Sequence, residues 1–155
     1  MGIRERTTVD MEIAGCLVNL VQIGLMFAVG VLLFGVRPGS VPALVAVSLA
    51  LAASANGMGL LVAALGRTEA QVNGFSVLLA VALSALGGMM VPSFVMPPGL
   101  RLLSRFTPHA WALEGYHDAM IRGLGLRDVL PEAGVLLGFA ALFFAFALWR
   151  FRFER

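Results

Sequence analysis

Charged residues are scarce in this chain, and lysine is absent. Charged side chains make up 13% of the sequence, all eleven basic residues are arginine, and the net charge is +2. Soluble domains carry about 25% charged residues, so this composition excludes an ordinary soluble domain. With no basic cluster, the chain gives no indication of nucleic-acid binding. The single cysteine, Cys16, excludes a disulfide framework within the chain.

Apolar residues are what the sequence has in excess. Hydrophobic residues make up 59% of the chain, and the mean hydropathy is +0.91. A helix of about 20 apolar residues crosses a bilayer, and four runs approach or exceed that length: 13–34, 42–65, 72–91 and 133–149. We therefore predict an all-α membrane protein with four transmembrane helices, forming one domain over residues 1–155 with both termini on one side.

The distribution of arginine favours cytoplasmic termini. Six arginines fall on the side of the termini and five on the other, which is nearly balanced. Four of those five lie within residues 92–131, and they count for less if that segment docks on the protein. We expect a multi-pass protein of the plasma (inner) membrane with both termini in the cytoplasm.

Residues 92–131, between the third and fourth runs, are too charged to span a bilayer and too apolar for an ordinary loop. Non-helical backbone at membrane depth is tolerated only against protein or a water-filled cavity. We therefore predict a re-entrant or interfacial helical segment that gates or caps a pathway. The candidate residues for an extracellular gate are Pro92, Pro97, Pro98, Pro108, His109, Trp111 and Glu114.

Within this segment, Thr107 and Pro108 predict the start of a helix over residues 109–122. Helical spacing assigns Leu113 to an apolar face, and Asp118 and Arg122 to a polar face where they form an i,i+4 pair. The polar residues near this helix match no familiar metal spacing, and no nucleophile motif accompanies them. We expect neither an enzyme nor a metal or cofactor site.

Uncharged polar residues interrupt the apolar runs. Such residues usually face other helices and form hydrogen bonds there. Two interpretations remain open: they hold the bundle together, or they line a substrate path. The path candidates are Asn19, Gln22, Asn56, Asn73 and Ser84. Small residues at four-residue spacing, such as Ala53 with Gly57 and Gly134 with Gly138, predict that helices approach closely. No ionisable residue lies near the centre of a run, so a proton or ion relay is not expected.

The order of these elements resembles the C-terminal part of an ABC-2 type transporter permease, the membrane subunit of certain ATP-driven exporters. Three stretches carry the resemblance in order: LLVAALGRTEAQV at 60–72, LGGMMVPSFVMPP at 86–98, and FTPHAWALEGY at 106–116 with IRGLG at 121–125. Each stretch alone is weakly specific, whereas their order and spacing together are more specific.

The resemblance implies a permease with six spans in its usual form, of which this chain would supply the last four. The first two spans and most of a cytoplasmic coupling helix would be missing, with residues 4–12 as its remnant. Because the chain has no GxxxxGK[ST] loop, ATP would be bound by a partner ABC ATPase subunit. Contacts to that partner would fall on residues 4–12 and 66–71, with Arg67, Thr68 and Glu69 as candidates.

The implied function is export of a drug, lipid or polysaccharide-like substrate at an interface with a second permease subunit, in contact with membrane lipid. The alternative is a truncated membrane scaffold that binds partner helices without transporting anything.

Overall fold

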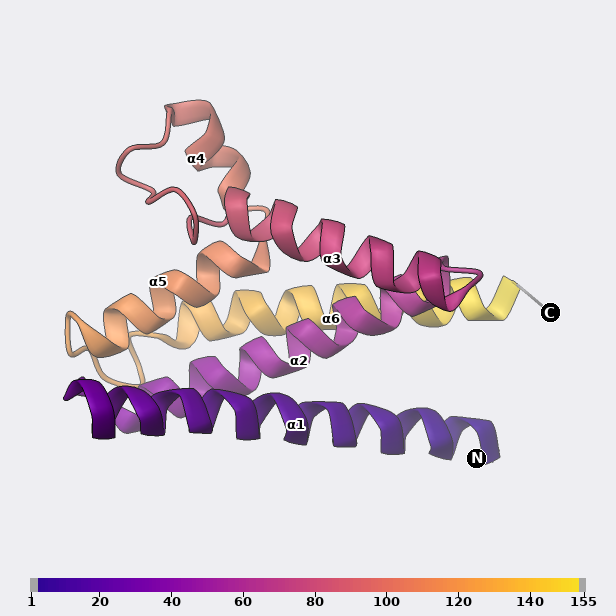
Figure 1. Ribbon diagram of the computed structural model, residues 1–155, viewed down its shortest axis with the longest axis horizontal. Helices are drawn as coiled ribbons and strands as arrows, with labels where there is room; N and C mark the ends of the chain where they lie inside the picture. The colour runs from indigo at the N-terminus through magenta and orange to yellow at the C-terminus, as the bar shows by residue number, and fades with distance from the viewer. Residues whose placement is uncertain (1–2, 154–155) are drawn as a thin grey trace.

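Six helices make up the computed structural model, which describes residues 3–153, with side chains for residues 13–150 (Figure 1). They are α1 (Ile3–Phe34), α2 (Val41–Leu65), α3 (Glu69–Leu86), α4 (Pro98–Ser104), α5 (Pro108–Met120) and α6 (Leu130–Phe153). Four of them, α1, α2, α3 and α6, are long and apolar enough to cross a membrane, and residues 3–153 contain no strand. The predicted all-α fold with four spans is confirmed.

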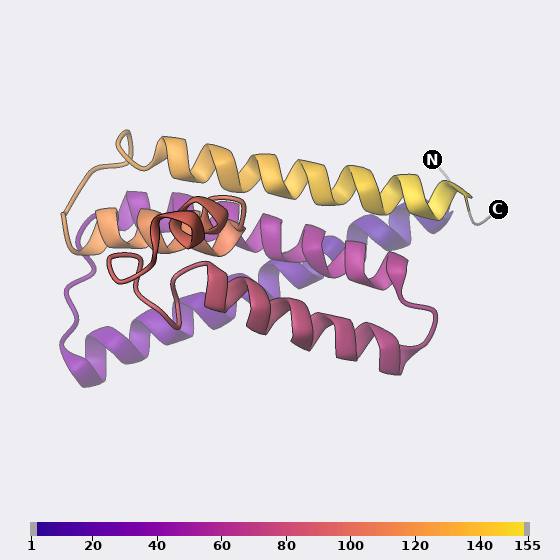
Figure 2. The same cartoon turned by 90° about the horizontal axis from the view of Figure 1, so that it is seen from above.

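The four long helices alternate in direction. The first turns of α1 and the last turns of α6 lie at one end of the bundle, beside the turn between α2 and α3 (Figures 1 and 2). We call this the terminal end. Helices α4 and α5 lie toward the opposite end, which we call the distal end. The chain therefore presents the short turn at residues 66–68 at the terminal end.

A local cap explains where the third span begins, and two glycines in contact with α5 explain where it ends. The Thr68 side chain caps α3 by accepting a hydrogen bond from the Gln71 backbone N at 3.2 Å, and the Gln71 side chain accepts one from the Arg67 backbone N at 3.0 Å. At the other end, α3 stops at Leu86 rather than at residue 91 as predicted. Gly87 lies against His109 of α5, and Gly88 has a φ of 93°, which favours glycine and ends the helix.

Helix α2 is the central element. It packs against α6 along much of its length and also contacts α1, α3 and α5. Gly57 lies against the Ala140 carbonyl and Phe143 of α6, so the predicted close approach at Gly57 is confirmed. Gly134 and Gly138 face open space within the chain. The main apolar core joins α2, α5 and α6 and consists of Ala43, Leu44, Val47, Ala50, Ala112, Ala119, Val129, Ala133 and Leu136.

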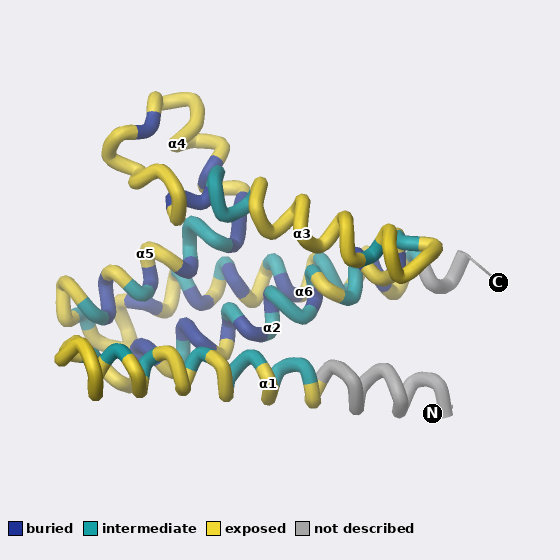
Figure 3. Tube along the Cα trace, in the orientation of Figure 1, coloured by how far each residue is buried: buried dark blue, intermediate teal, exposed yellow. Residues whose placement is uncertain are grey.

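The first and third spans lie at the edges of the bundle. The spanning windows of α1 and α3 contain no buried residue, and Figure 3 shows both helices largely exposed while α2, α5 and α6 hold most of the buried positions. Large apolar side chains such as Leu25, Met26 and Leu78 are exposed on these two helices. In a membrane, these faces meet lipid or other helices.

Helix α5 re-enters the bundle between α2 and α6, as the predicted re-entrant segment requires. The predicted assignment of its faces is wrong at two positions, however. Asp118 is 7% exposed and faces the bundle, whereas Leu113 is 38% exposed. The small residues Ala112, Gly115 and Ala119 form the packed face, because only small side chains let α5 come close to its neighbours. A Cβ on Gly115, for example, would crowd Val47 of α2 at 2.9 Å.

Candidate functional site

The turn between α2 and α3 is an exposed feature of the terminal end. Arg67, Thr68 and Glu69 are all exposed, and they border a hollow of about 470 Å³ together with Gly66, Val72 and Asn73. The Thr68 hydroxyl caps α3, so its first role is to fix the turn. Arg67 and Glu69 therefore place a cation and a carboxylate at this capped, exposed turn. The other predicted contact, residues 4–12, lies in the first turns of α1, and its side chains are outside the described part of the chain.

Two of the path candidates form a polar joint between α1 and α2. The Asn19 side-chain amide donates to the Asn56 side-chain oxygen at 2.8 Å, and the Asn56 amide contacts the Cys16 sulfur at 2.9 Å. Because a Cβ on Gly15 would lie 3.1 Å from Asn56, a small residue is required for α1 to approach here. We call Cys16, Asn19 and Asn56 the polar joint. It holds the bundle together, which is the first of the two interpretations of the polar residues in the spans.

The remaining path candidates do not join these two. Gln22 and Asn73 are exposed on α1 and α3, and Ser84 is partly buried near the distal end of α3. Asn73 borders the hollow at the terminal end. Within the described part of this single chain, no cavity brings the five residues together.

The distal segment is built from proline-initiated helices. Pro97 and Pro98 start α4, and Pro108 starts α5, where the Thr107 side chain accepts a hydrogen bond from the Ala110 backbone N at 3.4 Å. Pro92 accepts a backbone hydrogen bond from Val95 at 3.0 Å and so shapes the turn before α4. The predicted helix start at Thr107 and Pro108 is confirmed. Four of the gate candidates thus set the backbone course of the segment.

Trp111 and His109 connect α5 to its surroundings. The Trp111 indole N–H donates to the Arg105 carbonyl at 2.7 Å, and the Arg105 guanidinium lies 5.9 Å from the centre of the Trp111 ring. His109 packs against Gly87 at the end of α3, and its Nδ1 is buried without a hydrogen-bond partner. Burial lowers the pKa of His109 below its ordinary value of 6.5, because desolvation disfavours the charged imidazole.

A polar basin of about 430 Å³ opens between the end of α3, the loop after it, α4 and α5. We call it the distal basin. Its lining includes two of the gate candidates, Trp111 and Glu114. Its charged residues are Arg101, Arg105, Glu114, Asp118 and Arg122, joined by His117. In the described part of the chain, no three histidine, cysteine or acidic side chains lie close enough together to hold a metal ion.

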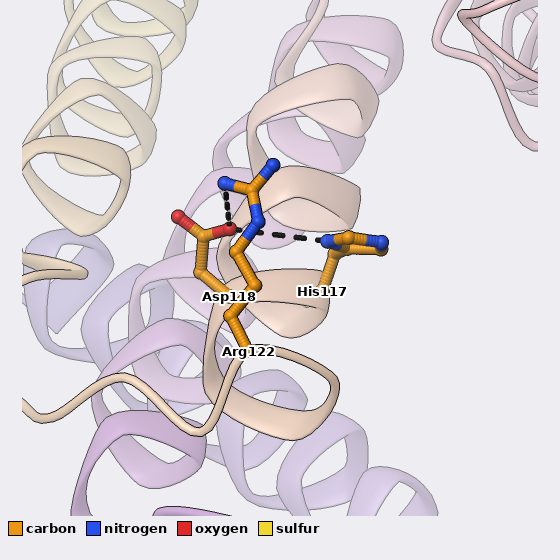
Figure 4. Close-up of polar contacts among 3 residues, drawn as sticks. All are labelled: His117, Asp118 and Arg122. Carbon is orange, nitrogen blue, oxygen red and sulfur yellow. Dashed lines mark hydrogen bonds and ion pairs between the residues drawn. The ribbon is translucent and has the colours of Figure 1, made fainter.

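The carboxylate of Asp118 organises one wall of the basin. The Arg122 guanidinium donates to Asp118 Oδ1 at 2.8 Å, and His117 Nδ1 lies 3.9 Å from the same oxygen (Figure 4). The predicted pair of Asp118 and Arg122 is confirmed, although Asp118 is buried rather than solvated. Arg101 and Arg105, which the sequence places at i,i+4 spacing, also line the basin. The i,i+4 spacing of the two arginines can be read from the sequence. The basin cannot, because its formation depends on how α4 packs over α5.

Tyr116 is a partly buried residue that connects α5 to the first two spans. Its hydroxyl lies 2.9 Å from Ser48 Oγ of α2, and its ring lies 5.8 Å from that of Phe27 of α1. Burial raises the pKa of Tyr116 above its ordinary value of 10, while the hydrogen bond to Ser48 acts in the opposite sense. Phe27 and Ser48 also line an apolar groove of about 370 Å³ between α1 and α2. One side chain of α5 therefore touches both walls of that groove.

Comparison with known proteins agrees with this architecture. The model of the ABC-2 type transporter family matches residues 11–121. The linearmycin resistance permease protein LnrN of Bacillus subtilis (strain 168) is 30% identical over 131 residues, a match that covers 84% of this chain and 34% of the relative. The chain thus spans about a third of that protein's length. No solved structure matches significantly. With four helices long and apolar enough to span a membrane and a family match over most of its length, the chain belongs to the ABC-2 type transporter family and is a multi-pass membrane protein.

Proposed function

We propose that this chain is the permease part of an exporter driven by a separate ABC ATPase subunit, and that the turn at residues 66–69 contacts that ATPase. The observation that carries the proposal is the exposed, capped turn at the terminal end, which presents Arg67 and Glu69 beside a hollow of about 470 Å³. A cation and an anion on a rigid corner suit a specific, charge-complementary protein contact. The central turns of the spans contain no ionisable residue, so the driving energy would come from ATP bound by the partner.

The orientation belongs to the same proposal. An ABC ATPase is cytoplasmic, so the terminal end would face the cytoplasm and the distal end the outside of the plasma membrane. This agrees with the arginines near both termini. It also makes the segment of α4 and α5 extracellular, where Pro92, Pro97, Pro98, Pro108, His109, Trp111 and Glu114 would act as a gate.

A second permease subunit would complete the substrate path. Gln22 on α1 and Asn73 on α3 are exposed on helices that also expose many large apolar side chains. Polar side chains within spans usually face other helices rather than lipid. These exposed faces therefore fit a protein partner, and the path would run where two subunits meet. The name of the Bacillus subtilis relative, a linearmycin resistance permease, supports a drug among the possible substrates.

The ATPase contact is tested by charge reversal at the turn. The tagged protein is purified in mild detergent from its native membranes, together with any ABC ATPase that associates with it, as wild type, Arg67→Glu and Glu69→Arg. Arg37→Glu is the matched control, because it reverses an exposed arginine in a loop at the distal end. We expect the two turn variants to lose co-purifying ATPase while the control keeps it. If every variant retains the ATPase, the turn is not the contact; if wild type also lacks it, the scaffold alternative stands.

The gate is tested separately, by export. Pro97 and Pro98 precede and begin α4, so replacing both with alanine frees the backbone without removing a side-chain contact in the bundle. We expect export of the drug substrate to fall while the amount of protein in the membrane stays the same. Normal export by this variant would remove the gate role of the two prolines.

A further inference from the structure

The distal basin has an excess of positive charge that the structure does not neutralise internally. Three arginines and two carboxylates line it, and one of those carboxylates, Asp118, is committed to Arg122 at 2.8 Å. Arg101 and Arg105 therefore face a single further carboxylate, Glu114. One side of the basin is short of anions.

The two arginines are held in place by contacts that leave donors for a ligand. Arg101 uses Nε to donate to the Ser93 carbonyl at 3.0 Å, so its two terminal nitrogens are not engaged in that bond. Arg105 lies over the Trp111 ring at 5.9 Å, and Trp111 is itself hydrogen-bonded to the Arg105 carbonyl. Anchored guanidinium groups lose less side-chain entropy when they bind, and their planar donor array suits the oxygens of a phosphate.

The same basin also has exposed apolar residues in its lining. Phe94 is 79% exposed and Leu113 is 38% exposed, and both line the basin with Trp111. Exposed aromatic residues beside arginines are typical of the headgroup region of a bilayer. The combination of anchored arginines with exposed apolar side chains suits a ligand with an anionic head and an apolar body.

We propose that the distal basin binds the phosphate headgroup of an anionic phospholipid, with Arg101 and Arg105 as the headgroup ligands and Phe94 and Leu113 against its acyl chains. This site does not depend on transport or on the ATPase contact. A bare phosphate has the same headgroup chemistry, so the test must distinguish a lipid from a soluble phosphate.

The basin contains its own fluorescent reporter. The chain has two tryptophans, and Trp149 lies in α6 toward the terminal end, so a Trp149→Phe background leaves Trp111 alone. This protein is reconstituted in nanodiscs of phosphatidylcholine that contain increasing amounts of phosphatidylglycerol with brominated acyl chains. Brominated phosphatidylcholine is the matched lipid. We expect saturable quenching of Trp111 at a much lower fraction of phosphatidylglycerol than of phosphatidylcholine.

Variants in the same background identify the ligands. Arg101→Gln should weaken the preference for phosphatidylglycerol about tenfold, as the loss of one charged hydrogen bond predicts. Arg101→Lys should restore part of it. Arg37→Gln removes the same charge at the same end but outside the basin, and it should bind like wild type. Equal quenching by the two lipids, or equal binding by the Arg101→Gln and Arg37→Gln variants, would overturn the proposal.

Competition with inorganic phosphate at constant ionic strength then separates the two sources of the headgroup. Recovery of Trp111 fluorescence at millimolar phosphate would show that the site accepts the headgroup alone. Quenching that phosphate does not reverse would assign the site to the lipid, with the exposed apolar residues contributing to binding. In both cases the far-UV circular dichroism of each variant should match that of wild type, because the pair of Asp118 and Arg122 is left intact.

Discussion

The hydroxyl of Tyr116 and the Oγ of Ser48 lie 2.9 Å apart, which joins the re-entrant helix α5 directly to the central span α2. Ser48 is 7% exposed, so water replaces this bond poorly when it is lost. Tyr116 also contacts Phe27 of α1. A single residue of α5 thus links the first two spans of the chain.

Removing this hydrogen bond should destabilise the protein in a way that a double-mutant cycle detects. Tyr116→Phe and Ser48→Ala should each lower the free energy of unfolding by about 1 kcal/mol, because each leaves a buried hydroxyl unpaired or a bond unmade. The loss of unfolding free energy in the double variant should be smaller than the sum of the losses in the two single variants. The measurement is the unfolding of purified protein in detergent, and strict additivity would mean that the bond contributes no stability.

A matched pair of glycines tests how tightly the loop between α1 and α2 is tied to α5. Gly35 and Gly39 have φ values of 63° and 62°, so alanine is strained at both. Only at Gly39 would a Cβ collide with the Ala119 carbonyl, and the neighbouring Ser40 N–H donates to that carbonyl at 3.2 Å. Gly35→Ala should therefore lower the free energy of unfolding by about 1 kcal/mol. Gly39→Ala should lower it by about 1–3 kcal/mol more than Gly35→Ala does.

The difference between the two glycine variants isolates the collision from the backbone strain. It is measured by thermal unfolding in the same detergent. If Gly35→Ala and Gly39→Ala are equally destabilised, the C-terminal end of α5 moves to accommodate the new Cβ. The loop then does not fix the position of α5.

The polar joint predicts which asparagine holds the bundle together. Asn56→Ala removes the acceptor for Asn19 and the contact with Cys16, so the free energy of unfolding should fall by about 1 kcal/mol. Asn73→Ala, on the exposed face of α3, should stay within about 0.5 kcal/mol of wild type. The same two variants bear on transport: a loss of export in Asn73→Ala at unchanged stability would support a place for Asn73 on the substrate path.

His109 predicts a pH dependence of stability. Burial lowers its pKa in the folded state below the ordinary value of 6.5. As the pH falls below 6.5, the unfolded chain takes up a proton that the folded chain still excludes, so the free energy of unfolding decreases until the folded pKa is reached. Above pH 6.5 this group makes no difference to the pH dependence. Thermal unfolding measured from pH 8 to pH 5 should show the decrease.

Two substitutions assign this pH dependence to one histidine. His109→Asn should remove part of the decrease, while His117→Asn, at an exposed position of the same helix, should retain it. The chain has no other histidine, and the carboxylates are common to all three proteins. Identical pH profiles for wild type and His109→Asn would show that the buried imidazole does not control stability in this range.

The sequence predicted the spans and the helix starts because these depend on local signals. The length and hydropathy of each run predict a span, and Thr107 with Pro108 predicts a helix start, from neighbouring residues alone. The structure confirms the four spans and this helix start. The end of α3 differed because Gly87 and Gly88 act through their contact with α5, which no local pattern contains. The faces of α5 were wrong for a related reason: its packed side is selected by small residues that allow close approach, so Asp118 is buried with Arg122 although its polarity indicated solvent.

The candidate site was less predictable than the fold. The turn at Arg67, Thr68 and Glu69 is exposed, as a contact requires, but its partner is not part of this chain. The path candidates were chosen for polarity alone, and polarity does not distinguish the polar joint at Asn56 from the exposed Asn73. Whether a polar side chain in a span faces a neighbour or a pathway depends on the arrangement of whole helices and, in the proposed assembly, also on a second subunit.

Helix α3 buries none of its side chains, yet it runs from the turn at residues 66–68 to the contact of Gly87 with His109. A rod attached mainly at its two ends can tilt without losing much packing along its length. A push on the corner at Arg67 would therefore arrive, as a displacement of the far end, at the first turn of the re-entrant helix. Helix α3 is in this way a mechanical link between the two ends of the protein.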